Sequence, residues 1–289
     1  MTATKMSTNM SLITRNLNPS KSYCKKNKLD IDSWFQVAQI DYEKLIEEYS
    51  FNNLFKGFAK NQLKLLDVGC GTAKFPSLLD EKLDGDIHLL ADLLDISEYC
   101  LQEAKKQFDS CQYLSTNKTY LSATENLHQL VEKTNSYDII WAIHYLCTVN
   151  PNRMTDVYLY CLDFLGDRGK FLIYQLAEKS SYNNLYSFYL SHYPELKKTT
   201  DFLTSEEHKK ILDRLRINYE NIRFEFTHRI NFESKKILEI YLKKCIYDNT
   251  LDVLSFFRPI LQECFDAESN QYKFDQVVDF LIIDKVRNI

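Results

Sequence analysis

The sequence predicts an α/β fold with a mostly parallel sheet and helices on both of its faces. Short apolar runs alternate with segments of helical spacing over the first two thirds of the chain. One apolar run, at residues 64–68, leads directly into a Gly-x-Gly turn, which suits a buried parallel strand followed by a helix. The 289 residues are enough to bury a full core.

The parallel strands are expected where apolar runs stop at turn-forming or helix-capping residues. A helix at 75–83 tolerates Pro76 in its first turn. Ser97 is a good N-cap for the next helix, on which apolar residues recur at helical spacing. The expected strands cover residues 64–68, 87–94, 112–114, 137–143 and 170–175.

The last part of the chain is expected to mix helices with two further strands, at 221–230 and 277–283. Apolar residues at helical spacing predict the helices, and Pro259 predicts a kink in the last of them. The expected helices after the fourth strand cover residues 155–165, 205–215, 235–247 and 251–265.

Residues 1–29 differ from the rest, because they carry lysine and arginine but no acidic residue. Their Ser-, Thr- and Asn-rich composition predicts a flexible basic N-terminal tail. The alternative is a segment that becomes ordered over the active site when ligand binds. Residues 30–289 are expected to form one domain, which begins with a helical cover at 30–60.

The composition is that of a globular protein, with 45% hydrophobic and 26% charged residues. No apolar run reaches the roughly 20 residues of a membrane span, and the chain opens on no signal-peptide core, so we expect a cytoplasmic protein without a membrane partner. The net charge of −4 argues against nucleic acid as the main partner. The eight cysteines form no C-x-x-C pair and His192, His208 and His228 lack metal spacing, so no metal site is expected.

The turn Gly69-Cys70-Gly71 is the first candidate ligand site. Glycine leaves room for a ligand to approach the backbone between a strand and a helix. A dinucleotide fingerprint would need a third glycine where Lys74 stands, so that ligand class is disfavoured. A purely structural turn is the alternative.

A carboxylate at the end of the second strand adds to the case for a ligand. Such a group can accept hydrogen bonds from both hydroxyls of a ribose. Asp92 and Asp95 both stand near this end. Asp95 is favoured, because it lies at the junction between the strand and the helix that Ser97 caps.

These two segments resemble a known family. Leu-Asp-Val-Gly-Cys-Gly-Thr at 66–72, followed by Leu-Asp-Ile-Ser at 94–97, resembles motifs I and II of class I methyltransferases that use S-adenosylmethionine (SAM). The resemblance implies a SAM-dependent enzyme with a Rossmann-like, seven-stranded sheet whose last strand is antiparallel. It places Gly69 and Gly71 against the methionine part of SAM, Asp95 on the ribose and Ile96 beside the adenine.

Other cofactor contacts follow from the same resemblance. Family members often carry Asp-Ala before the fourth strand, on the adenine amine. Here Ser122-Ala123-Thr124 holds that place without an aspartate, so Ser122 or Thr124 would substitute. The remaining residues expected at the cofactor are Asp67, Cys70 and Ile143.

The layout of the last third is similar to histamine N-methyltransferase and its small-molecule relatives. A helical insert at about 232–270 precedes the last strand, where it would cover the substrate side. In those relatives an amide at the place of Gln276 faces substrate. Tyr42, with Trp34 and Phe35, precedes the cofactor motif and could form an aromatic cage, although a buried helix face is the favoured interpretation for each residue taken singly.

His144 is the candidate catalytic residue, because it ends the fourth strand, beyond which ligands of open α/β sheets bind. It could orient an amine or accept its proton, and Tyr145 is a second substrate candidate. Packing after an apolar strand is the plain alternative for His144.

The sequence therefore predicts SAM-dependent methylation of a small-molecule acceptor, at an amine nitrogen in preference to oxygen. The alternatives are a nucleic-acid or protein methyltransferase, which the basic tail favours, a small-molecule O- or carboxyl-methyltransferase, and a SAM-binding protein without catalysis. An acidic net charge and the lack of an Asn-Pro-Pro-Tyr-type motif argue against action on nucleic acid bases.

Overall fold

The computed structural model describes residues 30–130, 137–196 and 202–285. The tail expected at 1–29 lies outside these residues.

One mixed sheet runs through the molecule in the order β3-β2-β1-β4-β5-β8-β6, and a two-residue strand, β7, pairs with β8 at its end. Every pairing from β3 to β5 is parallel, whereas β8 is antiparallel to both β5 and β6. The predicted seven-stranded, mostly parallel sheet with an antiparallel last strand is confirmed, with β7 as a short addition. The strands are β1 (Gln62–Val68), β2 (His88–Asp95), β3 (Leu114–Leu121), β4 (Tyr137–Ile143), β5 (Leu165–Leu176), β6 (Glu220–Asn231), β7 (Phe265–Asp266) and β8 (Gln271–Asp284).

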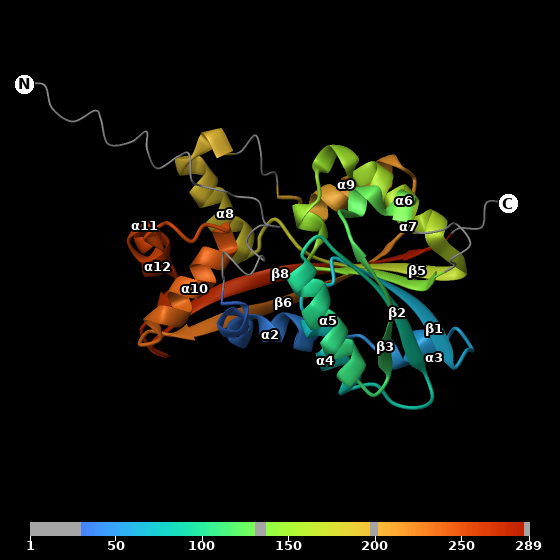
Figure 1. The fold of residues 1–289 in the computed structure, drawn as a ribbon. Coiled ribbons are helices and arrows are strands. Elements are labelled where there is room, and N and C mark those ends of the chain that lie inside the picture. Colours follow the sequence, from blue (N-terminus) through green and yellow to red (C-terminus); the bar gives the residue numbers. More distant parts are fainter. Residues whose placement is uncertain (1–29, 131–136, 197–201, 286–289) are drawn as a thin grey trace, which may run out of the picture.

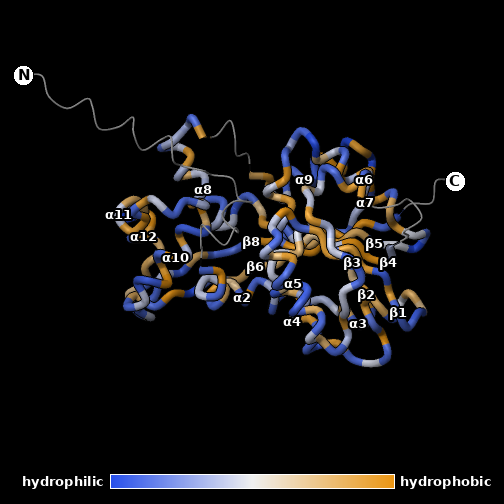
Figure 2. The backbone as a smooth tube through the Cα atoms, viewed as in Figure 1, coloured by the Kyte–Doolittle hydropathy of each residue, from blue (hydrophilic) through white to orange (hydrophobic). Residues whose placement is uncertain are grey.

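Helices cover both faces of the sheet, as predicted (Figure 1). On one face lie α2 (Ile31–Glu48), α3 (Phe51–Lys56), α4 (Lys74–Asp80) and α5 (Glu98–Ser110). On the other lie α6 (Leu127–Leu130), α7 (Met154–Phe164) and α9 (Ser205–Arg214). Each face has its own cluster of buried apolar side chains, and the most apolar stretches of the chain coincide with the central strands (Figure 2).

A third group of helices gathers beside the ends of β6 and β8 (Figure 1). It consists of α8 (Ser181–His192), α10 (Lys235–Ile246), α11 (Val253–Phe256) and α12 (Arg258–Cys264). These helices share a separate apolar cluster that includes Tyr189, Leu242 and Phe257. We call them the cap. Three of its four helices fall within residues 232–270.

Some elements differ from the sequence prediction for identifiable reasons. β3 begins where the predicted strand was to end, because its polar residues sit on the exposed edge of the sheet and leave little apolar pattern. β8 starts six residues early, since its first half alternates between exposed and buried. The segment 251–265 forms two helices, with Pro259 in the first turn of α12. α8 was not predicted, because its Ser- and Asn-rich sequence has weak helix propensity.

None of the helices in the described residues combines the length and the apolar character that a membrane span requires.

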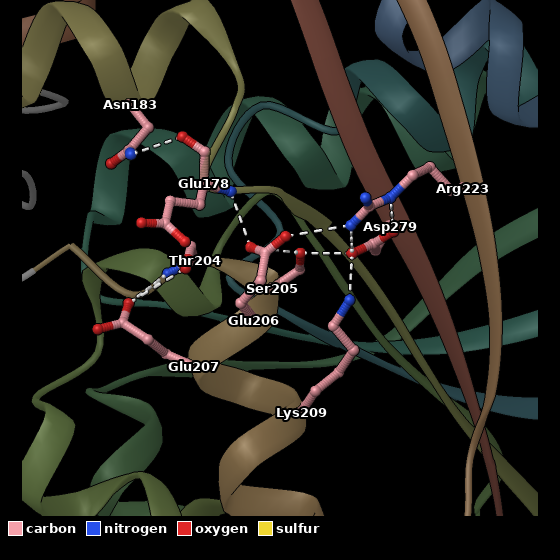
Figure 3. Close-up of polar contacts among 9 residues, drawn as sticks. All are labelled: Glu178, Asn183, Thr204, Ser205, Glu206, Glu207, Lys209, Arg223 and Asp279. Atoms are coloured by element: carbon pink, nitrogen blue, oxygen red, sulfur yellow. Dashed lines mark hydrogen bonds and ion pairs between the residues drawn. The ribbon is translucent and has the colours of Figure 1, made fainter.

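A buried ion cluster ties the far edge of the sheet to α9 (Figure 3). Asp279 on β8 accepts hydrogen bonds from Arg223 of β6 at 2.8 and 2.9 Å. It also accepts from Lys209 at 2.7 Å and from Ser205 at 2.6 Å, both on α9. Burial by itself would raise the pKa of Asp279, but these donors lower it to about 2. The arrangement compensates a fully buried carboxylate with two cations.

We expect Asp279→Asn to lower the free energy of unfolding by roughly 2–4 kcal/mol, because it leaves the donors around a buried site without their charge. Because the folded-state pKa is depressed, the contribution is present above the unfolded value of 3.8 and is lost as pH falls toward about 2. Urea unfolding measures the effect. The matched control is Asp275→Asn on the same strand, whose exposed side chain accepts a hydrogen bond from Thr227 and should cost less than about 0.5 kcal/mol. Equal losses in the two variants would contradict the assignment.

Candidate active site

A cavity of about 280 Å³ lies at the carboxyl ends of β1, β2 and β4. Its walls include the glycine turn after β1 and Asp95 at the end of β2. They also include Trp34, Asp41 and Tyr42 of α2, Tyr182 of α8 and Lys244 of α10. One cavity therefore joins the expected cofactor residues to a second region, built by α2 and the cap, which we call the acceptor side.

The two glycines of the turn serve different purposes. Both have positive φ, 71° at Gly69 and 52° at Gly71, a conformation that favours glycine. A Cβ on Gly69 would lie 2.0 Å from the ring of Tyr145, so Gly69 is required by protein packing. A Cβ on Gly71 would meet nothing within 4 Å. The open backbone that a ligand can approach is therefore at Gly71.

Asp95 stands at the cavity wall and is held by the backbone. Its Oδ2 accepts from the N–H of Gly71 at 3.0 Å, and its Oδ1 accepts from the N–H of Ser97 at 2.8 Å. Burial raises the pKa of Asp95, and these backbone donors oppose the shift. Each oxygen keeps further acceptor capacity for a ligand hydroxyl. Ile96 follows it along the same wall.

Asp92 has a different place. Tyr137 donates to its Oδ2 at 2.6 Å, and Asn117 donates to its Oδ1 at 2.7 Å. Asp92 is not among the described residues that line the cavity. Its carboxylate ties β2 to β3 and β4, so the geometry favours Asp95 as the ligand-binding acid.

Asp67 and Cys70 flank the glycine turn, and both line the cavity. Burial raises the pKa of Asp67 to about 7, and the nearby Asp95 carboxylate adds to the shift. Asp67 thus changes its charge near neutral pH. Burial also raises the pKa of the Cys70 thiol, which keeps it neutral.

Of the residues expected at the adenine end, one lines the cavity and two do not. Ile143 lines the cavity. Neither Ser122 nor Thr124 is among the described residues that line it; Ala123 and Glu125 hold this stretch of the wall. Ser122 Oγ donates to the carbonyl of Ala123, and the buried Thr124 Oγ1 donates to the hydroxyl of Tyr145. The structure therefore gives both hydroxyls local partners, because the 3₁₀ turn that begins at Thr124 directs them into the protein.

His144 ends β4 with a positive φ of 53°, which is uncommon for a residue with a side chain. Its backbone N–H donates to Tyr174 at 2.8 Å, and its ring lies in the cavity wall. Nε2 of His144 is buried and makes no hydrogen bond within the described residues. Burial lowers the pKa of His144, so the ring is neutral at neutral pH.

Asp41 is the functional candidate that sequence reasoning missed. Its carboxylate is 2% exposed and lies in the cavity wall, with Oδ2 3.7 Å from Nε2 of His144. Oδ1 is 2.8 Å from Nε2 of His228 on β6. A signal did exist, because Asp41 shares a buried helical stripe with Ala38, Tyr42 and Leu45, where a lone acid is out of place.

The predicted substrate residues take different places. Tyr42 lines the cavity, with its ring centroid 5.8 Å from that of His144 and 5.8 Å from that of Phe35. Trp34 lines the cavity too, and Lys244 lies 5.2 Å over its ring. Tyr145 also lines the cavity, but its ring packs on Gly69 and thus on the cofactor side.

Gln276 does not face the cavity as expected. Its side chain is buried and is not among the described residues that line the wall. Its Oε1 accepts from Ser180, and its Nε2 donates to the hydroxyl of Tyr241 at 3.2 Å. Tyr241 of α10 lies between Gln276 and the acceptor side, so the amide reaches that side only through other residues.

The half of the cavity around Gly71 fits a cofactor with a ribose and an amino-acid end. Gly71 offers open backbone, Asp95 offers anchored acceptor oxygens, and Asp67 offers a second carboxyl. These groups are those that the family resemblance assigns to SAM.

Comparisons with known proteins agree with this geometry. Residues 66–171 match the family model of a methyltransferase domain. The YcgJ protein from Bacillus subtilis shares the fold with a TM-score of 0.54 at 12% identity, over 86% of this chain and all of that chain. The plantazolicin methyltransferase BpumL, solved with S-adenosylhomocysteine (SAH), has a TM-score of 0.52 at 14% identity, over 93% of this chain and 95% of that chain.

The similarity to a possible histamine N-methyltransferase from Thermotoga maritima is weaker, with a TM-score of 0.46 at 14% identity, over 89% of this chain and 95% of that chain. No curated protein matches the sequence.

We expect Asp95→Ala to weaken SAH binding by roughly 1.5–3 kcal/mol, because it removes hydrogen bonds to a charged acceptor. Calorimetry measures the loss. Asp92→Asn is the matched control: it should lower stability through Tyr137 and Asn117 while SAH affinity stays within about twofold. Normal affinity in Asp95→Ala, with a loss in Asp92→Asn, would reverse the assignment.

A second expectation concerns pH. Ionised Asp67 accepts hydrogen bonds from a cationic amino group more strongly than the neutral acid does. SAH affinity should therefore be full above pH 7 and decline as pH falls through the pKa of about 7. Calorimetry between pH 5.5 and 8.5 with roughly half-unit steps tests this. Asp67→Asn should bind more weakly and without that slope, whereas a slope retained in the variant would exclude Asp67 as its source.

Proposed function

We propose that this chain is a class I SAM-dependent methyltransferase and that it methylates a small-molecule acceptor at an amine nitrogen. The observation that carries the proposal is the single cavity that joins Gly71 and Asp95 to His144, Asp41 and Tyr42. A nitrogen acceptor suits a wall that combines a neutral imidazole with a carboxylate and aromatic rings.

The residues have different roles according to their place in the cavity. SAM would be held by the residues that line the cofactor side of the cavity: Asp67, Gly69, Cys70, Gly71, Asp95, Ile96 and Ile143. When bound, SAM supplies the methyl group on a sulfonium that is already a good leaving group. The chain therefore needs chiefly to align the acceptor, exclude water and take up the acceptor's proton. α2 and the cap supply the walls that exclude water.

His144 is the proposed proton acceptor. An amine attacks only through its free electron pair, so an ammonium must first lose a proton. The lowered pKa of His144 keeps its ring neutral, and Nε2 has acceptor capacity on the cavity side. The left-handed backbone at His144 supports this role, since strained conformations concentrate at functional sites.

Methyl transfer from SAM to a panel of small amines, alcohols and carboxylates, read by mass spectrometry, tests the proposal. Bulk RNA and a protein lysate depleted of small molecules are the competing acceptors. Transfer to amines in the panel supports the proposal. Transfer to RNA or protein alone, or to alcohols alone, would overturn it.

We expect His144→Ala to bind SAH normally and to lose roughly 10²–10⁴-fold in turnover, the usual range for general acid–base catalysis. In the unmodified protein the rate should fall at acid pH with a midpoint below the ordinary value of 6.5, because burial lowers the pKa of His144. This acid limb should be altered in the variant. His128→Ala on α6, whose ring stacks on Tyr160, is the control and should keep the normal profile. An unchanged rate and profile in His144→Ala would make it a packing residue.

A further inference from the structure

A line of buried polar side chains leads from β8 to Asp41 on the acceptor side. Oδ1 of Asp41 is 2.8 Å from Nε2 of His228, and Nδ1 of His228 is 2.9 Å from the hydroxyl of Tyr241. The hydroxyl of Tyr241 is 3.2 Å from Nε2 of Gln276, and Oε1 of Gln276 accepts from Ser180. All five residues are buried. We call this line the polar chain.

The direction of every bond in the polar chain follows from the carboxylate at its end. An ionised carboxylate only accepts, so Nε2 of His228 must carry the proton. In the neutral ring Nδ1 then accepts, so Tyr241 donates to it. The Tyr241 oxygen in turn accepts from the amide of Gln276, which can only donate from its nitrogen. Each donor therefore points toward Asp41, and bonds aligned in this way strengthen one another.

This alignment fixes the orientation of the Asp41 carboxylate through Oδ1 and leaves Oδ2 outside the polar chain. Four buried tyrosines, Tyr42, Tyr174, Tyr182 and Tyr241, have their pKa values raised by burial and, in addition, by the Asp41 charge. The aromatic side chains thus surround the carboxylate. A buried carboxylate is stabilised by a cation that contacts it directly, and Lys244 lines the same cavity as a second basic group.

The free edge of the carboxylate faces that cavity. Oδ2 lies 3.7 Å from Nε2 of His144, which is too long for a hydrogen bond but leaves both atoms beside the same space. Nε2 of His144 has no hydrogen-bond partner among the described residues. A single nitrogen of a ligand, placed about 2.9 Å from both Oδ2 of Asp41 and Nε2 of His144, could donate a hydrogen bond to each of them. Rings of Tyr42 and Tyr182 line the same cavity and suit a cation.

We propose that Asp41 is the specificity-determining residue for the acceptor, which it binds as a protonated amine between Oδ2 and the ring of His144, and that the polar chain positions Asp41 for this task. The proposal rests on the amine acceptor of the proposed function. It assigns His228, Tyr241, Gln276 and Ser180 as positioning residues.

The test compares cations with neutral molecules of the same shape. The probes are primary amines from methylamine to phenethylamine, each paired with the alcohol of the same carbon skeleton and with a carboxylate of similar size. Binding is measured by calorimetry on the full chain saturated with SAH. We expect at least one amine to bind tighter than its alcohol by roughly tenfold or more, the scale of a hydrogen bond to a charged group. Equal binding of amine and alcohol, tighter binding of a carboxylate through Lys244, or no amine binding at all would overturn the proposal.

Single substitutions test which residue produces the preference for an amine over the matching alcohol. Asp41→Asn keeps the shape of the side chain and should abolish the preference for amine over alcohol while SAH affinity is unchanged. Tyr241→Phe removes the donor to His228 and should reduce the preference severalfold, with Asp41 still in place. Asp248→Asn is the matched control: this buried acid on the cap also accepts from a tyrosine, Tyr189 at 2.8 Å, but is not among the described cavity residues. Retention of the full preference in Asp41→Asn would sink the assignment.

The proposed function and the role of Asp41 can be contradicted independently of each other. If amines bind through Asp41 but receive no methyl group from SAM, the recognition site stands and the proposed reaction falls. If amines are methylated by Asp41→Asn with undiminished selectivity over alcohols, the reaction stands and the role of Asp41 falls.

Discussion

The contact between Gly69 and the ring of Tyr145 determines how the two halves of the site meet. A Cβ at Gly69 would lie 2.0 Å from the ring, so only glycine allows the tyrosine to sit there. β1 and β4 are neighbours, with Asp67 opposite Trp141, so the turns that follow them meet at one edge of the sheet. For Tyr145 to fold back over Gly69, the chain must turn sharply directly after Ile143. His144 takes that turn with a positive φ, at a cost of order 1–3 kcal/mol.

The same contact separates the cofactor side from the acceptor side. Tyr145 covers the glycine turn and bonds Thr124, whereas the adjacent His144 ring lies toward Asp41 and Tyr42. The cofactor side is built from consecutive strand–turn–helix units. The walls of the acceptor side come from α2, α8 and α10, and β6 and β8 supply His228 and Gln276 behind them; the sheet brings these elements together from both ends of the described chain. Changes in the cap can therefore alter the acceptor wall while the glycine turn stays as it is.

This difference explains what could be predicted from the sequence. The central strands were found because β1, β2 and β4 are continuous apolar runs, and the cofactor turn was found because its residues are contiguous. α8 was missed, since Ser, Asn and Tyr dominate its sequence and only packing within the cap makes it helical. The pair of Asp41 and His228 spans 187 positions, and no local pattern announces such a contact. Gln276 was expected to face the substrate, but its buried amide does not line the cavity, and the strand pattern alone does not show that Tyr241 of α10 packs against it.

Asp41 and Asp279 show two ways in which this fold surrounds a buried carboxylate with hydrogen-bond donors. Asp279 receives Arg223 and Lys209, so its charge is cancelled by neighbours, and it stabilises the edge of the sheet. Asp41 receives an aligned neutral donor at Oδ1, while its Oδ2 faces His144 at 3.7 Å across a shared space. The neighbours of Asp41 at Oδ1 are neutral in the aligned chain, whereas those of Asp279 are cations. Only Asp41 lines the cavity that also contains Gly71 and Asp95, so of the two carboxylates only Asp41 can contact a ligand bound there.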